Sequence, residues 1–440
     1  MVTTGYACLA PPFSLVENCK RILAGELWQL PLLQPEVPTF PEREKINMNN
    51  FTFHIPTEVI FGRGTEQQAA NLVKKYGGTK VLLVSGGHSA EKSGLLGKVE
   101  QELTSAGIPF EKLGGVQPNP LLELAEKGTE LAAKTGVDFL LAVGGGSVID
   151  TAKAIAVGTA NPGTPLWDFW THKAEVTKGL PVGAILTISA AGSEMSDSAV
   201  LTNEALHVKR GLSTPWNRAK FAILDPELTL TLPVYQVACG VADIMMHTME
   251  RYFSPVVGNE LTDGIAEALL RTVIRNGKAA VSDPHDYAPM SELMWAGSLS
   301  HNDLTGLGGV KDFATHQLGH ELSATFNVAH GASLTTVWGS WAQYCMAQNP
   351  ERFAGFAEKV WQVSGGSTEE KAVSGIEKTV SYFRSIGMPT CFTELGVGVQ
   401  SEEELHGLAD RCVYHGTRTI GHFKELNGED CYQIYKDANH

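Results

Sequence analysis

The sequence predicts an α/β domain with a parallel sheet, followed by a domain built almost entirely of helices. Between residues 65 and 224, short apolar segments alternate with longer amphipathic ones, and after Asp225 the strand-like segments stop. Strands joined by helical crossovers form parallel sheets that are covered on both faces. A chain of 440 residues is also long enough for two domains with a large buried core. We therefore expect domains at residues 48–230 and 231–440.

The first 47 residues differ from the rest of the chain. They are rich in proline, beginning with Pro11 and Pro12, and only residues 16–27 have a helix-like pattern. They contain no secretory apolar region with a cleavage site, and their charges do not suit a transit peptide. We expect residues 1–47 to be an extension outside the fold, which makes Met48 a candidate start of translation.

The elements of the first domain follow in chain order. Residues 51–55 and 58–61 are expected to form a β-hairpin with its turn near Pro56. Apolar residues at helical spacing predict helices at 65–76, 94–106 and 121–135. Compact apolar runs predict strands at 80–84, 110–113, 138–143, 182–187 and 221–224.

The second domain is expected to be helical from its first residues onward. Pro233 suits the first turn of a helix over residues 234–253, since its missing N–H has no partner there anyway. We place the domain boundary within residues 226–233. We find no internal repeat and no low-complexity tract.

Composition and charge exclude several classes of protein. The chain has 48 acidic and 34 basic residues, a net charge of −14, which disfavours binding to a phosphate backbone. No apolar run of about 18 residues predicts a membrane span. The seven cysteines are scattered, without a C-x-x-C pair. An odd, dispersed set indicates reduced thiols and a cytoplasmic protein.

A glycine-rich turn follows the predicted strand at 138–143. Gly144, Gly145, Gly146 and Ser147 lead into a helix that begins near Val148. Glycines let the backbone approach a ligand closely, and a helix N-terminus offers free N–H groups to a pyrophosphate. A plain tight turn is the alternative reading of such a cluster. The longer string GGGSVIDTAK, which includes Asp150, is more specific and indicates a Rossmann-like dinucleotide site.

A second glycine turn follows the predicted strand at 80–84. An NAD-selective site places a carboxylate here to grip the ribose hydroxyls, and that carboxylate repels a 2′-phosphate. No acid occupies residues 85–90, and Gly86, Gly87 and Ser89 offer N–H groups and a hydroxyl instead. We expect NADP(H) to be preferred, with NAD(H) possible. A simple surface turn is the alternative.

Five metal-ligating side chains fall at helical spacing. Asp243 and His247 are four residues apart on one predicted helix, and His316 and His320 are four apart on another, with His330 following. Residues at this spacing share one helix face. An isolated histidine is usually a structural or surface residue. One carboxylate with several imidazoles instead predicts a site for one divalent metal.

Four motifs in this order resemble the iron-containing (group III) alcohol dehydrogenase family: GGGSVIDTAK, TISAAGSE, ADIMMHTME and HQLGHELSATFNVAHG. The resemblance runs from about Met48 to the C-terminus. It is greatest to the branch of NADPH-dependent butanol dehydrogenases and broad-range aldehyde reductases. It implies an architecture like that of dehydroquinate synthase, and it implies that the chain forms a homodimer. It also implies hydride transfer between NADP(H) and small primary alcohols or aldehydes, such as butanol and butanal.

The resemblance assigns roles to individual residues. Its metal ligands are Asp243, His247, His316 and His330. His320 matches a histidine near the nicotinamide and substrate that does not bind the metal, and we expect it to relay a proton. The residues that match family cofactor contacts are Asn119, Gly145, Gly146, Ser147, Thr187 and Ser193. A basic residue beside Gly211 is expected near the ribose; Lys209 and Arg210 are both candidates, and we favour Arg210. The ligands accept Fe²⁺ or Zn²⁺.

Two other functions compete with this one. The dehydroquinate-synthase-like lyases share the architecture, but their phosphorylated sugar-acid substrate needs clustered basic residues, and residues 303–331 hold only Lys311. A non-catalytic cofactor-binding protein is the second alternative, which the full ligand set opposes. The chain departs from the family at Asp303, where glycine is common, so the shape of the substrate pocket is expected to differ there.

Overall fold

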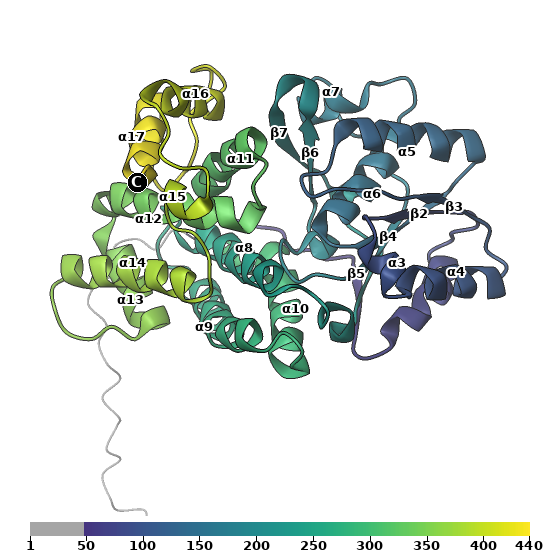
Figure 1. Cartoon of the computed structure of the whole chain (residues 1–440), viewed down its shortest axis with the longest axis horizontal. Helices are drawn as coiled ribbons and strands as arrows, with labels where there is room; N and C mark the ends of the chain where they lie inside the picture. The colour runs from purple at the N-terminus through teal and green to yellow at the C-terminus, as the bar shows by residue number, and fades with distance from the viewer. Residues whose placement is uncertain (1–47) are drawn as a thin grey trace, which may run out of the picture. The chain divides into compact units, whose positions relative to one another are not determined.

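The structure, a computed structural model, describes residues 48–440. An α/β domain, drawn from purple to teal in Figure 1, is followed by a helical domain, drawn from teal to yellow. The predicted fold class is confirmed. The last strand of the first domain ends at Leu224, and the first long helix of the second begins at Val234. The expectations for residues 1–47, including the helix-like patch at 16–27, lie outside the described residues.

The α/β domain is built on a six-stranded parallel sheet in the order β1-β8-β5-β4-β2-β3. The strands are β1 (Glu58–Phe61), β2 (Val81–Ser85), β3 (Phe110–Leu113), β4 (Phe139–Gly144), β5 (Val182–Leu186) and β8 (Phe221–Leu224). Every residue of β2, β4, β5 and β8 is buried. Continuous apolar runs of this kind are typical of strands covered on both faces.

Helices cover both faces of this sheet. They are α2 (Ala69–Lys75), α3 (Ser89–Lys92), α4 (Leu95–Ser105), α5 (Leu122–Thr135), α6 (Gly146–Ala160) and α7 (Leu166–Trp170). Side chains of a strand alternate between the faces. In β2, Leu82 and Val84 therefore pack with α5 and α6, whereas Val81 and Leu83 pack with α2 and α4.

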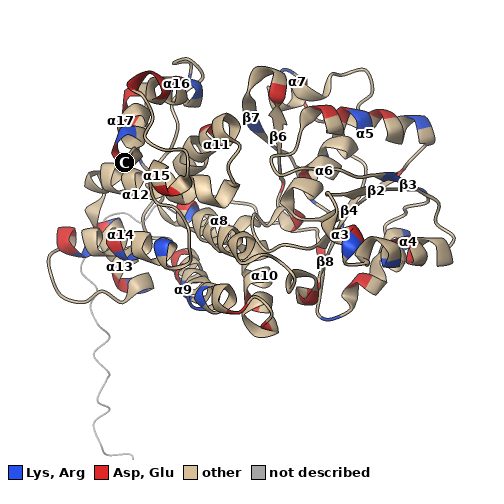
Figure 2. Ribbon diagram, in the orientation of Figure 1, with Lys and Arg blue, Asp and Glu red and all other residues tan. Residues whose placement is uncertain are grey.

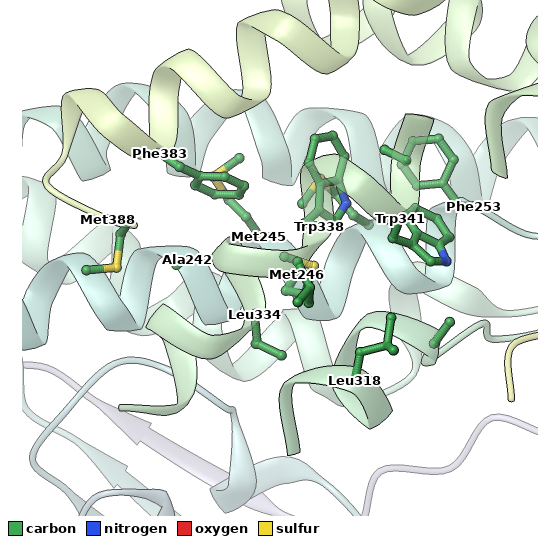
Figure 3. Close-up of a cluster of buried hydrophobic side chains, with 14 of the residues drawn as sticks. Ala242, Met245, Met246, Phe253, Leu318, Leu334, Trp338, Trp341, Phe383 and Met388 are labelled. Atoms are coloured by element: carbon green, nitrogen blue, oxygen red, sulfur yellow. The ribbon is translucent and has the colours of Figure 1, made fainter. Parts of the chain in front are cut away.

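The helical domain surrounds one long buried helix, α8. Its helices are α8 (Val234–Tyr252), α9 (Glu260–Ser282), α10 (Tyr287–His301), α11 (Ala314–Phe326), α12 (His330–Cys345), α13 (Pro350–Trp361), α14 (Thr368–Ser385), α15 (Phe392–Leu395), α16 (Glu402–Cys412) and α17 (Gly428–Ala438). Met245, Met246 and Phe253 share one core with Trp338 and Trp341 of α12 (Figure 3). Helix α12 carries no charged side chain, as Figure 2 shows, because it is packed within the domain. Among residues 48–440, no helix is both long and apolar enough to cross a bilayer.

The predicted hairpin of residues 51–55 and 58–61 is wrong. Residues 51–55 form no strand, and β1 pairs in parallel with β8, with Glu58 opposite Phe221. The segment around Pro56 lacks the Asn-Gly or Asp-Gly turn that a tight hairpin favours. Pairing with the buried strand β8 instead satisfies the backbone hydrogen bonds of β1 and places β1 over the core of the domain.

One antiparallel hairpin was not predicted. It consists of β6 (Ser198–Asn203) and β7 (Val208–Ser213), which pair with each other outside the main sheet. Its residues mix apolar and polar types, so no compact apolar run marked either strand.

Candidate active site

A cleft of about 1480 Å³ lies between the two domains. Turns that follow β2, β4 and β5 form one wall, and α8, α11 and α12 contribute to the other. Every site residue predicted from the sequence lines this cleft: Gly86, Gly87, Ser89, Asn119, Gly145, Gly146, Ser147, Asp150, Thr187, Ser193, Arg210, Asp243, His247, His316, His320 and His330. The cleft therefore brings residues far apart in the sequence to one place.

Four of these side chains converge on one point. The Oδ1 atom of Asp243 lies 3.5 Å from Nε2 of His247 and 3.7 Å from Nε2 of both His316 and His330. The ligand atoms of Asp243, His316 and His330 all lie within 4.8 Å of one another. In the described chain, Asp243 Oδ1 and His316 Nε2 are buried without a hydrogen-bond partner. Such orphaned lone pairs around a common point fit one divalent metal.

His316 is the best-oriented of the three imidazoles. Its Nδ1 contacts Glu250 Oε2, and Glu250 Oε1 accepts a hydrogen bond of 3.0 Å from the backbone N–H of His316. A carboxylate behind a histidine ligand fixes the ring and increases its basicity. Burial opposes protonation of His316, but Glu250 and Asp243 together raise its pKa to about 9.

His320 lies beside this cluster without belonging to it. Its ring centroid is 5.4 Å from that of His330 and 6.2 Å from that of His316. Burial, and then the charge of Lys209, lower its pKa well below the ordinary value for histidine. The imidazole of His320 is therefore neutral, and a ring nitrogen can accept a hydrogen bond from a group bound in the cleft.

The predicted dinucleotide turn stands at the N-terminus of a long helix. Helix α6 begins at Gly146, directly after β4, and has no acidic residue in its first turn. A Cβ on Gly145 would lie 2.2 Å from Cγ2 of Ile188, so only glycine fits at this close approach. Exposed N–H groups and the positive end of the helix dipole suit an anionic pyrophosphate.

Two side chains of this region serve the protein itself. Asp150 accepts hydrogen bonds from the Ser193 hydroxyl at 2.5 Å and from the Val200 N–H at 2.9 Å. The buried Lys153 donates to the carbonyl oxygens of Ser193 and Ser198, at 2.6 and 2.7 Å. These bonds hold the loop that carries Ser193. The prediction overlooked Lys153, although it stands in the GGGSVIDTAK string.

The two basic residues beside Gly211 differ in their surroundings. Lys209 is buried, and its ammonium donates to Oδ1 of Asn119 at 2.9 Å, so these two candidate cofactor contacts meet. Burial lowers the pKa of Lys209 to about 8. The guanidinium of Arg210 stacks on Tyr414, with its Cζ atom 4.1 Å from the ring centroid. Both line the cleft, and Lys209 is bonded there to another candidate cofactor residue, Asn119.

Two further residues near the cluster, His301 and Asp303, are not among the predicted site residues, although the sequence marked Asp303 as a departure from the family. His301, at the end of α10, stacks on His247 with ring centroids 4.0 Å apart, and its Nδ1 contacts the Ala191 carbonyl. Asp303 has a φ of 80°, a conformation that favours glycine. Its carboxylate pairs with Arg218 at 3.0 Å and with Lys311, which ties the two domains together.

Comparison with known proteins gives matches along nearly the whole described chain. A family model described as "Iron-containing alcohol dehydrogenase" matches residues 56–226, and one described as "Fe-containing alcohol dehydrogenase family, C-terminal" matches residues 236–439. NADH-dependent butanol dehydrogenase A of Clostridium acetobutylicum is 39% identical over 89% of this chain and 100% of its own length. NADPH-dependent aldehyde reductase YqhD of Escherichia coli is 33% identical, over 89% and 100%.

Solved structures are similar to the same extent. The crystal structure of NADH-dependent butanol dehydrogenase A from Thermotoga maritima superposes with a TM-score of 0.86 at 34% identity, covering 90% of this chain and 100% of that one. The structure of Escherichia coli YqhD gives a TM-score of 0.85 at 32% identity, with the same coverage.

Proposed function

This chain belongs to the iron-containing alcohol dehydrogenase family, and we propose that it interconverts small primary aldehydes and alcohols, such as butanal and butanol, with NADP(H) as the preferred cofactor. It is a metal-dependent alcohol dehydrogenase/aldehyde reductase. The observation that carries the proposal is the convergence of Asp243, His247, His316 and His330 on the wall opposite the glycine turns.

We propose these four side chains as the metal ligands. The buried lone pairs of Asp243 and His316 support this assignment, since they have no other partner in the described chain. When bound, the metal polarises the carbonyl oxygen and the reduced nicotinamide supplies the hydride. Three imidazoles and one carboxylate accept iron or zinc, and the family description favours iron.

The chain's own residues orient the reactants. The N-terminus of α6 and the turn at Gly145 bind the pyrophosphate, and Lys153 keeps the Ser193 loop against it. Glu250 holds the ring of His316 in place. His320, outside the ligand cluster, exchanges the proton that the alcohol oxygen gains or loses.

The preference for NADP(H) is supported by the turn after β2. Gly86, Gly87 and Ser89 line the cleft there, and a Cβ on Gly87 would meet no atom within 4 Å. The turn therefore has room for a 2′-phosphate and no carboxylate to repel it. Relatives with both preferences exist: the butanol dehydrogenase A of Clostridium acetobutylicum is named for NADH and the aldehyde reductase of Escherichia coli for NADPH.

We also propose a cytoplasmic homodimer that binds neither nucleic acid nor membranes. Phe51 and Phe53 are 53% and 43% exposed, in a segment beside the edge strand β1, where a second copy can cover them. The cysteines that the structure describes are free thiols. The net charge of −14 disfavours nucleic acid.

An assay with butanal and NADPH under anaerobic conditions, with metal analysis, tests the function. We expect butanal reduction that is lost on chelation and restored by iron or zinc, while NADPH still binds the metal-free protein. Binding of NADPH without any aldehyde reduction in the metal-loaded protein would favour a non-catalytic protein. Turnover only of a phosphorylated sugar acid would favour the lyase alternative.

A further inference from the structure

One charged side chain continues the row of metal-site residues along α8. Asp243, His247 and Arg251 follow each other at intervals of four residues, so they lie on the same face of the helix. Arg251 lines the cleft, yet its side chain is buried, with a residue exposure of 3%. Four residues correspond to about 6 Å along a helix axis. The backbone positions of His247 and Arg251 therefore lie one helical turn apart, and the guanidinium of Arg251 reaches back to contact His247.

The guanidinium of Arg251 uses few of its donors within the described chain. Its Nη1 donates to the carbonyl oxygen of His247 at 2.7 Å and lies 3.4 Å from Nδ1 of the same residue. The Nε atom is buried without a hydrogen-bond partner. Its Cζ atom lies 5.0 Å from the ring centroid of Phe313, which also lines the cleft. A planar donor group with free hydrogens thus stands at the cleft wall.

The carboxylates near Arg251 are already paired with other groups. Asp303 binds Arg218 and Lys311, Asp197 binds Arg218 at 3.4 Å, and Glu250 contacts His316. Burial lowers the pKa of Arg251 to about 10, so the group stays cationic near neutral pH. A buried cation without an ion pair of its own is costly, and such charges are normally paired.

We propose that Arg251 binds a carboxylate on the substrate, so that the preferred substrates are short aldehydes with an acid group at the far end. This inference rests on the proposed function. The guanidinium contacts Nδ1 of His247, whereas Nε2 of the same ring faces Asp243, so a short chain, as in 4-oxobutanoate, is needed between the carboxylate and the aldehyde. In the reaction, the aldehyde carbon gains a hydride from NAD(P)H and its oxygen gains a proton, while the carboxylate is unchanged. The product is the ω-hydroxy acid.

The kinetic test compares kcat/KM for 4-oxobutanoate, 4-hydroxybutanal and butanal in the metal-loaded enzyme. In Arg251→Gln, the ratio of 4-oxobutanoate to butanal should fall about ten- to a hundred-fold, the value of one charge-assisted contact. Arg251→Lys should recover part of the ratio because it keeps the charge. Arg275→Gln, an exposed position on α9, removes the same charge outside the cleft and should leave the ratio unchanged.

A binding measurement gives a readout that does not depend on turnover. Calorimetry with 4-hydroxybutanoate and NADPH, a combination that cannot react, should show about tenfold weaker binding in Arg251→Gln than in the parent. Metal content and melting temperature show whether Arg251→Gln has simply lost its fold. If it has, the same binding and kinetic measurements on Arg251→Lys test the proposal. An unchanged ratio of 4-oxobutanoate to butanal in folded variants, or a loss confined to 4-hydroxybutanal, overturns the carboxylate proposal. The proposed function is still supported in that case if the variants reduce butanal. Failure to reduce any aldehyde would overturn both.

Discussion

His316 and His320 show how neighbours divide the roles of two similar residues. They stand one turn apart on α11, and nothing in their spacing says which one binds a metal. Glu250, on α8, orients His316 toward Asp243, whereas His320 lies outside the ligand cluster. The ligand set was predictable only through resemblance to a family. The supporting roles of Glu250 and Lys153 depend on contacts between distant segments, which the sequence does not display.

The first prediction separates metal binding from proton transfer. His316→Ala should remove the metal, and Glu250→Gln should weaken metal binding by about ten- to a hundred-fold because it releases the ring. His320→Ala should keep one metal per chain and lose about a hundredfold in kcat. Metal analysis of the purified variants, together with kcat for butanal, checks this. If His320→Ala lost the metal while His330→Ala kept it, the assignment would be reversed.

The second prediction concerns the turn after β2. Gly87→Asp should lower kcat/KM for NADPH by about ten- to a hundred-fold and leave that for NADH similar or higher, because a carboxylate repels the 2′-phosphate. The new side chain has room, so the fold should persist. Gly97→Asp, at an open position of α4 outside the cleft, is the matched control. A parent enzyme that prefers NADH, or uses both equally, would contradict the argument.

At the level of elements, the apolar runs located the sheet well. The strands at 80–84, 110–113, 138–143 and 221–224 agree with β2, β3, β4 and β8 within one residue, because buried parallel strands need continuous apolar sequence. The pairing of β1 with β8 joins segments about 160 residues apart, and its partner cannot be read locally. Strands β6 and β7 escaped prediction because their burial alternates only in part.

Helix α4 provides the third prediction. Burial, reinforced by the charge of Glu66, raises the pKa of Glu102 to about 7 from 4.5. The folded protein therefore holds this proton more tightly than the unfolded chain, and the free energy of unfolding falls as pH rises from 4.5 to 7. Glu102→Gln should raise the melting temperature by about 1–2 °C at pH 8 and have little effect at pH 4.5. Glu130→Gln, exposed on α5, is the control. An equal effect at both pH values would refute the assignment.

For the whole molecule, the fourth prediction is that residues 1–47 are dispensable. The relatives match over their entire length while covering 89% of this chain, and the family match begins at residue 56. A chain that starts at Met48 should keep its melting temperature and its activity with butanal. A chain that starts at Thr57 also loses the bond of Asn49 N–H to the Gly308 carbonyl, at 3.0 Å, and should be less stable. A large drop in melting temperature for the chain that starts at Met48 would show that residues 1–47 support the fold.

The division of ligands between domains has a consequence for how the catalyst is controlled. All four candidate metal ligands belong to helices α8, α11 and α12, while the glycine turns belong to the α/β domain. Neither domain alone can bind both the cofactor and the metal-bound substrate. The distance over which the hydride is transferred is therefore set by the packing of the two domains. Contacts between the domains, such as the ion pair of Asp303 with Arg218, then help to set this distance, although they touch neither the metal ligands nor the glycine turns. A substitution in these contacts between the domains should lower kcat by misaligning the cofactor and the substrate. The affinities for the metal and for the cofactor should stay the same.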